Sequence, residues 1–181
     1  WVVADGRLRS RAGQGPLARP EAADPSLFSS VLTAEVGRSG QVWYGGPNGY
    51  IGAVSNGTVN VFGEQPGQLL ETVWALVEAR NGDVWAGTAN GGLRRLRRGR
   101  FTSLTTGEGL SDNSVRCVFE DREGTLWVGT VGGGLNRVKP RKLTTYTTRD
   151  GLSHNVVMSL AQDADGTLWV GSNCGGLSVR R

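Results

Sequence analysis

His154, the single histidine of this 181-residue chain, is the side chain best suited to acid–base catalysis. Together with Ser153 and Asp150 it offers the three residue types of a serine hydrolase triad. These residues are nearly consecutive, however, and one short loop does not direct them toward each other as nucleophile and base. The neighbouring carboxylates Asp163 and Asp165 fall in a turn, where aspartate is common because it binds backbone N–H groups. The sequence therefore favours a non-enzymatic protein.

Metal and phosphate sites have little support. A structural zinc site takes about four His, Cys or carboxylate ligands, and the chain has one histidine and two distant cysteines. The glycine-rich segments 90–92 and 132–134 look like phosphate loops, but each precedes a strand-like segment and lacks the Lys-Ser/Thr pair of such loops. We expect turns at these positions, no cofactor and no metal.

Five arginines stand close together and form a candidate polyanion patch, namely Arg94, Arg95, Arg97, Arg98 and Arg100. The chain has a formal net charge of +4. Such a patch could attract nucleic acid, anionic lipid or sulfated glycans, and the alternative is a solvated strand and turn. Because Phe101 is the one aromatic residue beside the cluster, we expect no nucleic-acid partner.

The candidate residues described above lie within a 42-residue repeat. Tryptophan recurs at this interval as Trp1, Trp43, Trp85, Trp127 and Trp169. Glycine recurs in four copies three residues before the tryptophan, and again two and six residues after it. A period of about 40 to 45 residues with Gly and Trp is typical of β-propeller blades, whereas β-solenoid coils are usually shorter.

Each repeat predicts four short strands. In one copy these are residues 114–120, 125–130, 134–138 and 143–146. We expect Gly124 and its equivalents to adopt positive φ in the first hairpin. No segment of ten residues combines a helical period with freedom from glycine and turn signals.

We therefore predict an all-β fold, a β-propeller-type array of four-stranded antiparallel blades that is incomplete at both ends. The single domain, 1–181, would divide into the blade parts 1–26, 27–67, 68–109, 110–151 and 152–181. A seven-bladed ring would need about 294 residues at this period. We expect the chain to be a piece of a longer propeller, a ring that closes at a small size, or one of several chains whose blades assemble. A protein partner or further propeller sequence is expected to complete the blades.

The segment 120–130, EDREGTLWVGT, is followed by Gly133-Gly134-Leu135. This pattern resembles the two-component regulator propeller repeat, as do the linking loops at 107–113 and 149–155. The resemblance is strongest over 68–181. It implies the extracytoplasmic, periplasmic sensor part of a bacterial signalling protein such as a hybrid histidine kinase, with a small-molecule ligand that is often a glycan breakdown product.

Loops of successive propeller blades converge on one face around a central channel, where ligand pockets form. The polar residues expected on that face are Ser111, Asp112, Asn113, Ser153, His154 and Asn155, joined by Asn90 and Asn173 from the turns between the second and third strands. The alternative is that these residues cap strand ends and satisfy loop backbone groups.

Trp74, Arg116 and Met158 occupy equivalent places on the first strand of their repeats. An arginine would be costly at an apolar blade interface, so this position is predicted to face the channel. There Trp74 could stack on a sugar ring and Arg116 could pair with a carboxylate or sulfate. Alternatively, Trp74 fills the channel as a plug.

The resemblance also implies an oxidising compartment, in which Cys117 and Cys174 could form a disulfide between adjacent blades. Free thiols are the alternative, since the bond requires Cα atoms within about 7 Å.

The sequence as a whole indicates a non-enzymatic ligand-sensing or protein-binding module. The alternatives are a structural interaction platform in a multi-subunit complex and, less favoured, a propeller lyase. No apolar run is long enough to span a membrane.

Overall fold

The structure, a computed structural model, describes residues 2–4, 7–9, 30–55, 58–62, 71–139 and 142–180. These residues form β-strands joined by turns and short 3₁₀ segments, which confirms the all-β fold predicted from the repeat. A two-stranded hairpin, β1 (Val2–Ala4) with β2 (Arg7–Arg9), precedes four antiparallel sheets.

The four sheets follow one another along the chain. The first contains β3 (Thr33–Val36), β4 (Val42–Gly45), β5 (Ile51–Ser55) and β6 (Thr58–Phe62), and the second contains β7 (Val73–Glu78), β8 (Val84–Thr88), β9 (Leu93–Arg97) and β10 (Arg100–Leu104). The third contains β11 (Val115–Glu120), β12 (Leu126–Thr130), β13 (Leu135–Lys139) and β14 (Lys142–Tyr146), and the fourth contains β15 (Val157–Gln162), β16 (Leu168–Ser172) and β17 (Gly176–Arg180). Each sheet falls within one of the blade parts derived from the sequence.

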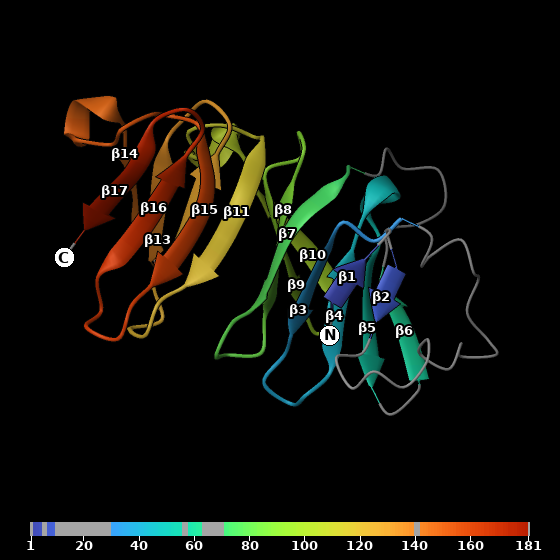
Figure 1. The fold of residues 1–181 in the computed structure, drawn as a ribbon. Helices are drawn as coiled ribbons and strands as arrows, with labels where there is room; N and C mark the ends of the chain where they lie inside the picture. The colour runs from blue at the N-terminus through green and yellow to red at the C-terminus, as the bar shows by residue number, and fades with distance from the viewer. Residues whose placement is uncertain are drawn as a thin grey trace.

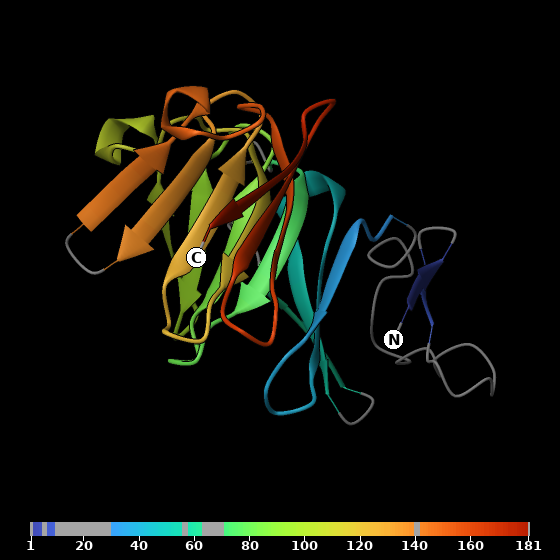
Figure 2. The same ribbon diagram turned by 60° about the vertical axis from the view of Figure 1, so that its left-hand side comes forward.

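The sheets stand side by side in a curved row, with β15, β11, β7 and β3 next to one another (Figure 1). The view from a second direction shows the same row of stacked sheets (Figure 2). Because the first strand of each sheet contacts the first strand of the next, these strands line the inner side of the arc. The array is therefore part of a propeller, with the first strands innermost.

The two ends of the array differ in their connections. The turns between first and second strands and between third and fourth strands lie at one end, which we call the hairpin end (the lower end in Figure 1). The turns between second and third strands and the loops between sheets lie at the other, the loop end. At the loop end, 3₁₀ turns span Pro47–Gly49, Thr106–Glu108 and Thr148–Asp150.

The first hairpin of each sheet turns at a glycine with positive φ. The φ values are 81° at Gly40, 78° at Gly82, 76° at Gly124 and 87° at Gly166. A residue with a Cβ is strained in this region, so glycine recurs there for a local backbone reason. The prediction made for Gly124 is confirmed.

Neighbouring sheets interlock through a second glycine. A Cβ added to Gly45, Gly87 or Gly129 would lie within 2.5 to 2.7 Å of a methyl group of the valine that begins the next sheet. These valines, Val73, Val115 and Val157, are almost fully buried. The glycine thus allows each sheet to approach its neighbour closely enough to bury the valine.

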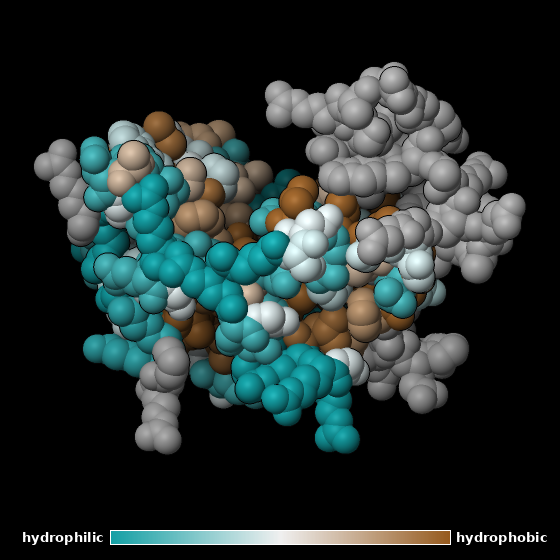
Figure 3. Space-filling view, turned by 90° about the horizontal axis from the view of Figure 1, so that it is seen from below, coloured by the Kyte–Doolittle hydropathy of each residue, from teal (hydrophilic) through white to brown (hydrophobic). Residues whose placement is uncertain are grey.

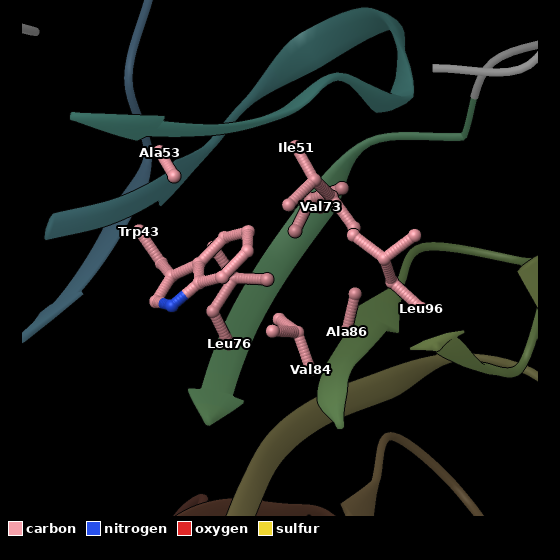
Figure 4. Packing of buried hydrophobic residues seen from close by; sticks show 8 residues of the cluster. All are labelled: Trp43, Ile51, Ala53, Val73, Leu76, Val84, Ala86 and Leu96. Atoms are coloured by element: carbon pink, nitrogen blue, oxygen red, sulfur yellow. The ribbon is translucent and has the colours of Figure 1, made fainter. Parts of the chain in front are cut away.

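The sheet interfaces form the hydrophobic core. Figure 4 shows one such cluster, in which Trp43, Ile51 and Ala53 of the first sheet meet Val73, Leu76, Val84, Ala86 and Leu96 of the second. Trp127 is likewise 4% exposed, whereas its equivalent Trp169, on the sheet that no later described sheet covers, is 38% exposed. The difference between Trp127 and Trp169 therefore follows from the presence of a next sheet.

Candidate functional site

A β-bulge recurs near the start of the first strand in three successive sheets. The pairing register shifts between Val73 and Ala75, between Val115 and Cys117, and between Val157 and Ser159. The extra residues at these shifts are Trp74, Arg116 and Met158. A bulge redirects the extra side chain and occurs often beside binding sites. The three residues that the sequence aligned thus share a special backbone position on the inner side of the arc.

Two of these bulge residues make direct contact. The guanidinium carbon of Arg116 lies 5.0 Å from the ring centroid of Trp74, which is a cation–π geometry. Both side chains are half-buried, and Met158 is 40% exposed. The pair presents an aromatic face and a planar cation together, near the loop end and on the inner side of the arc.

The loop residues predicted to bind a ligand are largely engaged with the protein itself. Ser111 donates its backbone N–H to Asn136 Oδ1 (3.1 Å), and its hydroxyl accepts from Asn136 Nδ2 (2.7 Å). Ser153 repeats the arrangement in the next sheet, with its N–H donated to Ser178 Oγ (2.8 Å). These serines hold the incoming loop against the third strand, which is the structural alternative considered above.

Asn113 and Asn155 have an equally structural role. Asn113 Oδ1 accepts from the backbone N–H of Thr106 (2.8 Å), and its carbonyl accepts from Gly92 N of the preceding sheet (2.9 Å). Asn155 makes the same two contacts with Thr148 and Gly134. Both residues close a 3₁₀ turn and tie neighbouring sheets together.

Asp112 is half-buried, whereas His154 and Asn173 are exposed. Asp112 accepts from the backbone N–H of Ser114 (2.8 Å), and His154 Nδ1 accepts from that of Val156 (3.0 Å). This contact occupies Nδ1 of the only histidine. Asn173 is exposed and donates its backbone N–H to the carbonyl of Val156 (3.0 Å).

The five clustered arginines do not form one patch. Successive residues of β9 face opposite sides of the sheet, so Arg94 lies on one side and Arg95 and Arg97 on the other. Arg95 donates to the buried carboxylate of Asp83 through Nε (2.8 Å), lies over the ring of Trp85 (5.3 Å), and shares Asp83 with Arg97 (3.5 Å). Arg98 and Arg100 are exposed at the hairpin end.

The disulfide between Cys117 and Cys174 is not formed, and both residues are free thiols. Cys117 lies in β11 against Gly129 and the following sheet, with Sγ 3.9 Å from the carbonyl oxygen of Val157. Cys174 is exposed in the turn between β16 and β17. Burial raises the pKa of the Cys117 thiol to about 12, so this thiol is unreactive near neutral pH.

Sequence reasoning missed a series of contacts that joins the sheets at the hairpin end. The backbone N–H of Arg80 donates to both oxygens of Glu120 (3.2 and 3.0 Å), and that of Arg122 donates to Gln162 Oε1 (3.0 Å). The guanidinium groups of Arg80 and Arg122 also reach backbone carbonyls of the following sheet. The signal was present, because Arg38, Arg80 and Arg122 are 42 residues apart.

A second pairing missed from the sequence links two of the periodic tryptophans to an aspartate six residues earlier. Trp127 Nε1 donates to Asp121 Oδ2 and Trp169 Nε1 donates to Asp163 Oδ2, each at 2.8 Å. The indole N–H at Asp163, with further N–H donors from the turn, lowers the pKa of that carboxyl. These aspartates therefore anchor the scaffold.

Within the described ranges, no three His, Cys, Asp or Glu side chains gather into a group that could hold a metal ion. None of the helices there has the length and apolar character needed to cross a bilayer.

Comparison with known structures supports the propeller assignment. The extracellular domain of a B. thetaiotaomicron protein assigned to a hybrid two component system aligns with a TM-score of 0.70 and 24% identity over 88% of this chain. A second such domain, assigned to a one component system, aligns with a TM-score of 0.67 and 20% identity over 84% of this chain. The chain spans 24% of the length of each of these structures.

Virginiamycin B lyase from Staphylococcus aureus is also similar, with a TM-score of 0.64 and 16% identity over 87% of this chain and 57% of the lyase. At these identities the similarity shows the fold. A search of curated proteins found no significant match.

Residues 109–132 and 151–174 match the sequence model of the two component regulator propeller family. Each match begins in the loop before a sheet and continues through its first two strands. The two matches cover the loop, turn and tryptophan positions that repeat in the structure. Two segments of the chain, one in the third sheet and one in the fourth, thus match the two component regulator propeller repeat.

Proposed function

We propose that this array is a non-enzymatic ligand-sensing module of a bacterial extracytoplasmic signalling protein. The observation that carries the proposal is the recurrent bulge, which places Trp74, Arg116 and Met158 on the inner side of the arc. The repeat family and the extracellular domains of similar fold support the setting.

The stacked pair indicates the class of ligand. The face of Trp74 suits a flat apolar surface, such as that of a sugar ring, and Arg116 suits a carboxylate, sulfate or phosphate. The scaffold requires neither a tryptophan nor an arginine at the bulge, because the fourth sheet carries Met158 at the same position. We assign these two residues as the centre of the site, with Asp112 and His154 at its rim.

The equivalent positions of neighbouring repeats suggest substitutions that the fold tolerates. Trp74→Met and Arg116→Met copy the residue of the fourth sheet, so the fold should be retained. We expect a ligand found by thermal-shift screening of neutral, carboxylated and sulfated oligosaccharides to lose at least about tenfold in affinity in each variant, the equivalent of one good contact. Asp112→His copies the neighbouring loop and should bind nearly normally.

A hit that both methionine variants retain would place the ligand elsewhere. The absence of any hit, together with a stable protein partner in pull-down, would favour the interaction-platform function. That second candidate has its own support, since Trp169, Leu177 and Val179 leave an apolar surface on the fourth sheet that a protein partner or further propeller sequence would cover.

A further inference from the structure

Positive charge gathers at the hairpin end of the array. In the described turns of this end the exposed basic residues are Arg38, Arg80, Arg97, Arg98, Arg100, Arg122 and Lys142, against the exposed carboxylates Glu123 and Asp165. At the loop end the exposed charges of the described loops are Glu108, Arg149 and Asp150. Arg38 and Arg80 contact the carboxylate of Glu120, and Arg97 contacts that of Asp83. The exposed charges of the hairpin end are nevertheless mainly basic, whereas those of the loop end are one cation and two carboxylates.

Part of this charge opposes folding. Arg97 pairs directly with Arg100 across the hairpin of the second sheet, and Lys139 pairs with Lys142 at the same position of the third sheet. Like charges directly opposite each other destabilise a hairpin. The equivalent pair in the first sheet is Ser55 with Thr58, so the scaffold does not require basic residues there.

The turn between β9 and β10 of the second sheet also carries a residue that local stability disfavours. Arg98 and Gly99 both adopt positive φ, 49° and 75°, in a two-residue hairpin loop. Asparagine, aspartate or glycine is the usual residue at the first of these positions. An arginine therefore occupies a strained position at the tip of an already basic hairpin, and violations of local rules of this kind concentrate at functional sites.

The cations are distributed from the inner to the outer side of the hairpin end and do not form a single row. Arg38, Arg80 and Arg122 come from the turns between first and second strands, at the inner side of the arc, whereas the two like-charged pairs come from the outer hairpins. The view onto this end shows hydrophilic side chains spread over much of its surface (Figure 3). Phe101, the aromatic residue beside the cluster, packs against the core, so it does not offer a platform for bases.

We propose that the hairpin end docks onto the surface of an anionic lipid membrane, with Arg97, Arg98 and Arg100 of the second sheet and Lys139 and Lys142 of the third in contact with lipid phosphates. A broad array of cations fits a charged plane better than a single nucleic-acid strand, which binds in a groove with aromatic stacking. The proposal is independent of the ligand site, which lies near the opposite end.

The test compares vesicle binding by the 181-residue chain and by variants that copy the first sheet. Arg97→Ser with Arg100→Thr, and Lys139→Ser with Lys142→Thr, replace the like-charged pairs by the Ser55–Thr58 pair. Cosedimentation would use phosphatidylcholine vesicles with and without phosphatidylglycerol. We expect binding that requires phosphatidylglycerol, falls about fivefold for each charge removed, and disappears at about 1 M salt, where the screening length is about 3 Å.

A matched control is Arg149→Ser, which removes one exposed cation from the loop end and should not change vesicle binding. The thermal midpoint of the Lys139→Ser, Lys142→Thr variant should equal or exceed that of the parent, because the like-charge repulsion is gone, whereas Arg97→Ser also removes a contact with Asp83. Equal binding to both vesicle types, or binding by the paired variants equal to that of the parent, would overturn the proposal. So would charge-dependent binding to soluble dextran sulfate without any binding to vesicles.

Discussion

At the residue scale, the periodic tryptophans show how one residue type meets two environments. Trp127 is buried between the third and fourth sheets and donates to Asp121, whereas Trp169 makes the same hydrogen bond on an uncovered sheet. We predict that Trp127→Ala lowers the free energy of unfolding by about 3–5 kcal/mol. Trp169→Ala should cost clearly less, because its side chain is 38% exposed in the native state.

Chemical denaturation of both variants and of the parent protein measures this difference. Equal losses for the two variants would show that Trp169 is covered in solution, by a second molecule or by another part of the chain. A Trp127→Ala protein with the parent's stability would contradict the assignment of this residue to the core.

The two cysteines should differ in reactivity. Because burial raises the pKa of Cys117 from 9.0 to about 12, its thiolate is scarce at pH 8, whereas Cys174 is exposed. We predict that maleimide modifies one thiol in the native protein and two after denaturation without reductant. The stability contributed by this shift is complete below pH 9 and is lost as the pH rises toward 12.

Mass spectrometry after labelling identifies the modified residue. Two thiols in the denatured protein confirm that the cysteines are free. No reactive thiol under the same conditions would indicate that the disulfide forms in the isolated protein.

At the element scale, the contact between neighbouring sheets depends on a glycine that faces a valine. A Cβ at Gly87 would lie 2.6 Å from Val115 Cγ1 and 3.0 Å from its backbone oxygen. We predict that Gly87→Ala destabilises the protein by about 1–3 kcal/mol by overpacking this contact. The measurement is the shift of the denaturation midpoint.

Two further variants isolate the cause. Gly171→Ala should cost less, since the nearest atom to its new Cβ is the rotatable hydroxyl of Ser159 (2.3 Å). Combining Gly87→Ala with Val115→Ala should be less destabilising than the sum of the two single changes, because the smaller residue leaves room for the new methyl group. Additive losses would show that the two positions do not act through their contact.

At the scale of the whole molecule, the uncovered fourth sheet should govern association. Leu177 is 67% exposed, whereas its equivalent Leu135 is 1% exposed beside a fourth strand and a following sheet. The outer edge of β17 carries backbone groups that another strand can bind. We predict that the 181-residue chain self-associates as its concentration rises, as judged by light scattering.

Leu177→Ser combined with Val179→Thr should shift this association to higher concentration, because both residues lie exposed on β17. Val131→Ser, at an exposed valine of the loop end, serves as the control and should leave it unchanged. A monodisperse monomer across the concentration range would mean that the edge is protected, for example by pairing of the terminal strands.

The sequence alone was sufficient for the pattern of strands and turns that repeats locally. The 42-residue spacing predicted the sheets, and Gly124 marked its hairpin because a positive φ is a property of one residue and its neighbours. Alignment of the repeats also identified Trp74, Arg116 and Met158 as equivalent. It did not identify them as bulge residues, since a bulge is defined by the register of two paired strands.

Tertiary structure decided what each polar residue does. Ser111 bonds with Asn136 and Asn113 supports a neighbouring sheet, so these loop residues are structural, although their types suited ligand binding equally well. Arg116 lies over Trp74, 42 residues earlier, and Trp169 is exposed although its sequence context matches that of Trp127. Such contacts join residues tens of positions apart, and they exist because sheets pack against one another, which no local pattern in the chain specifies.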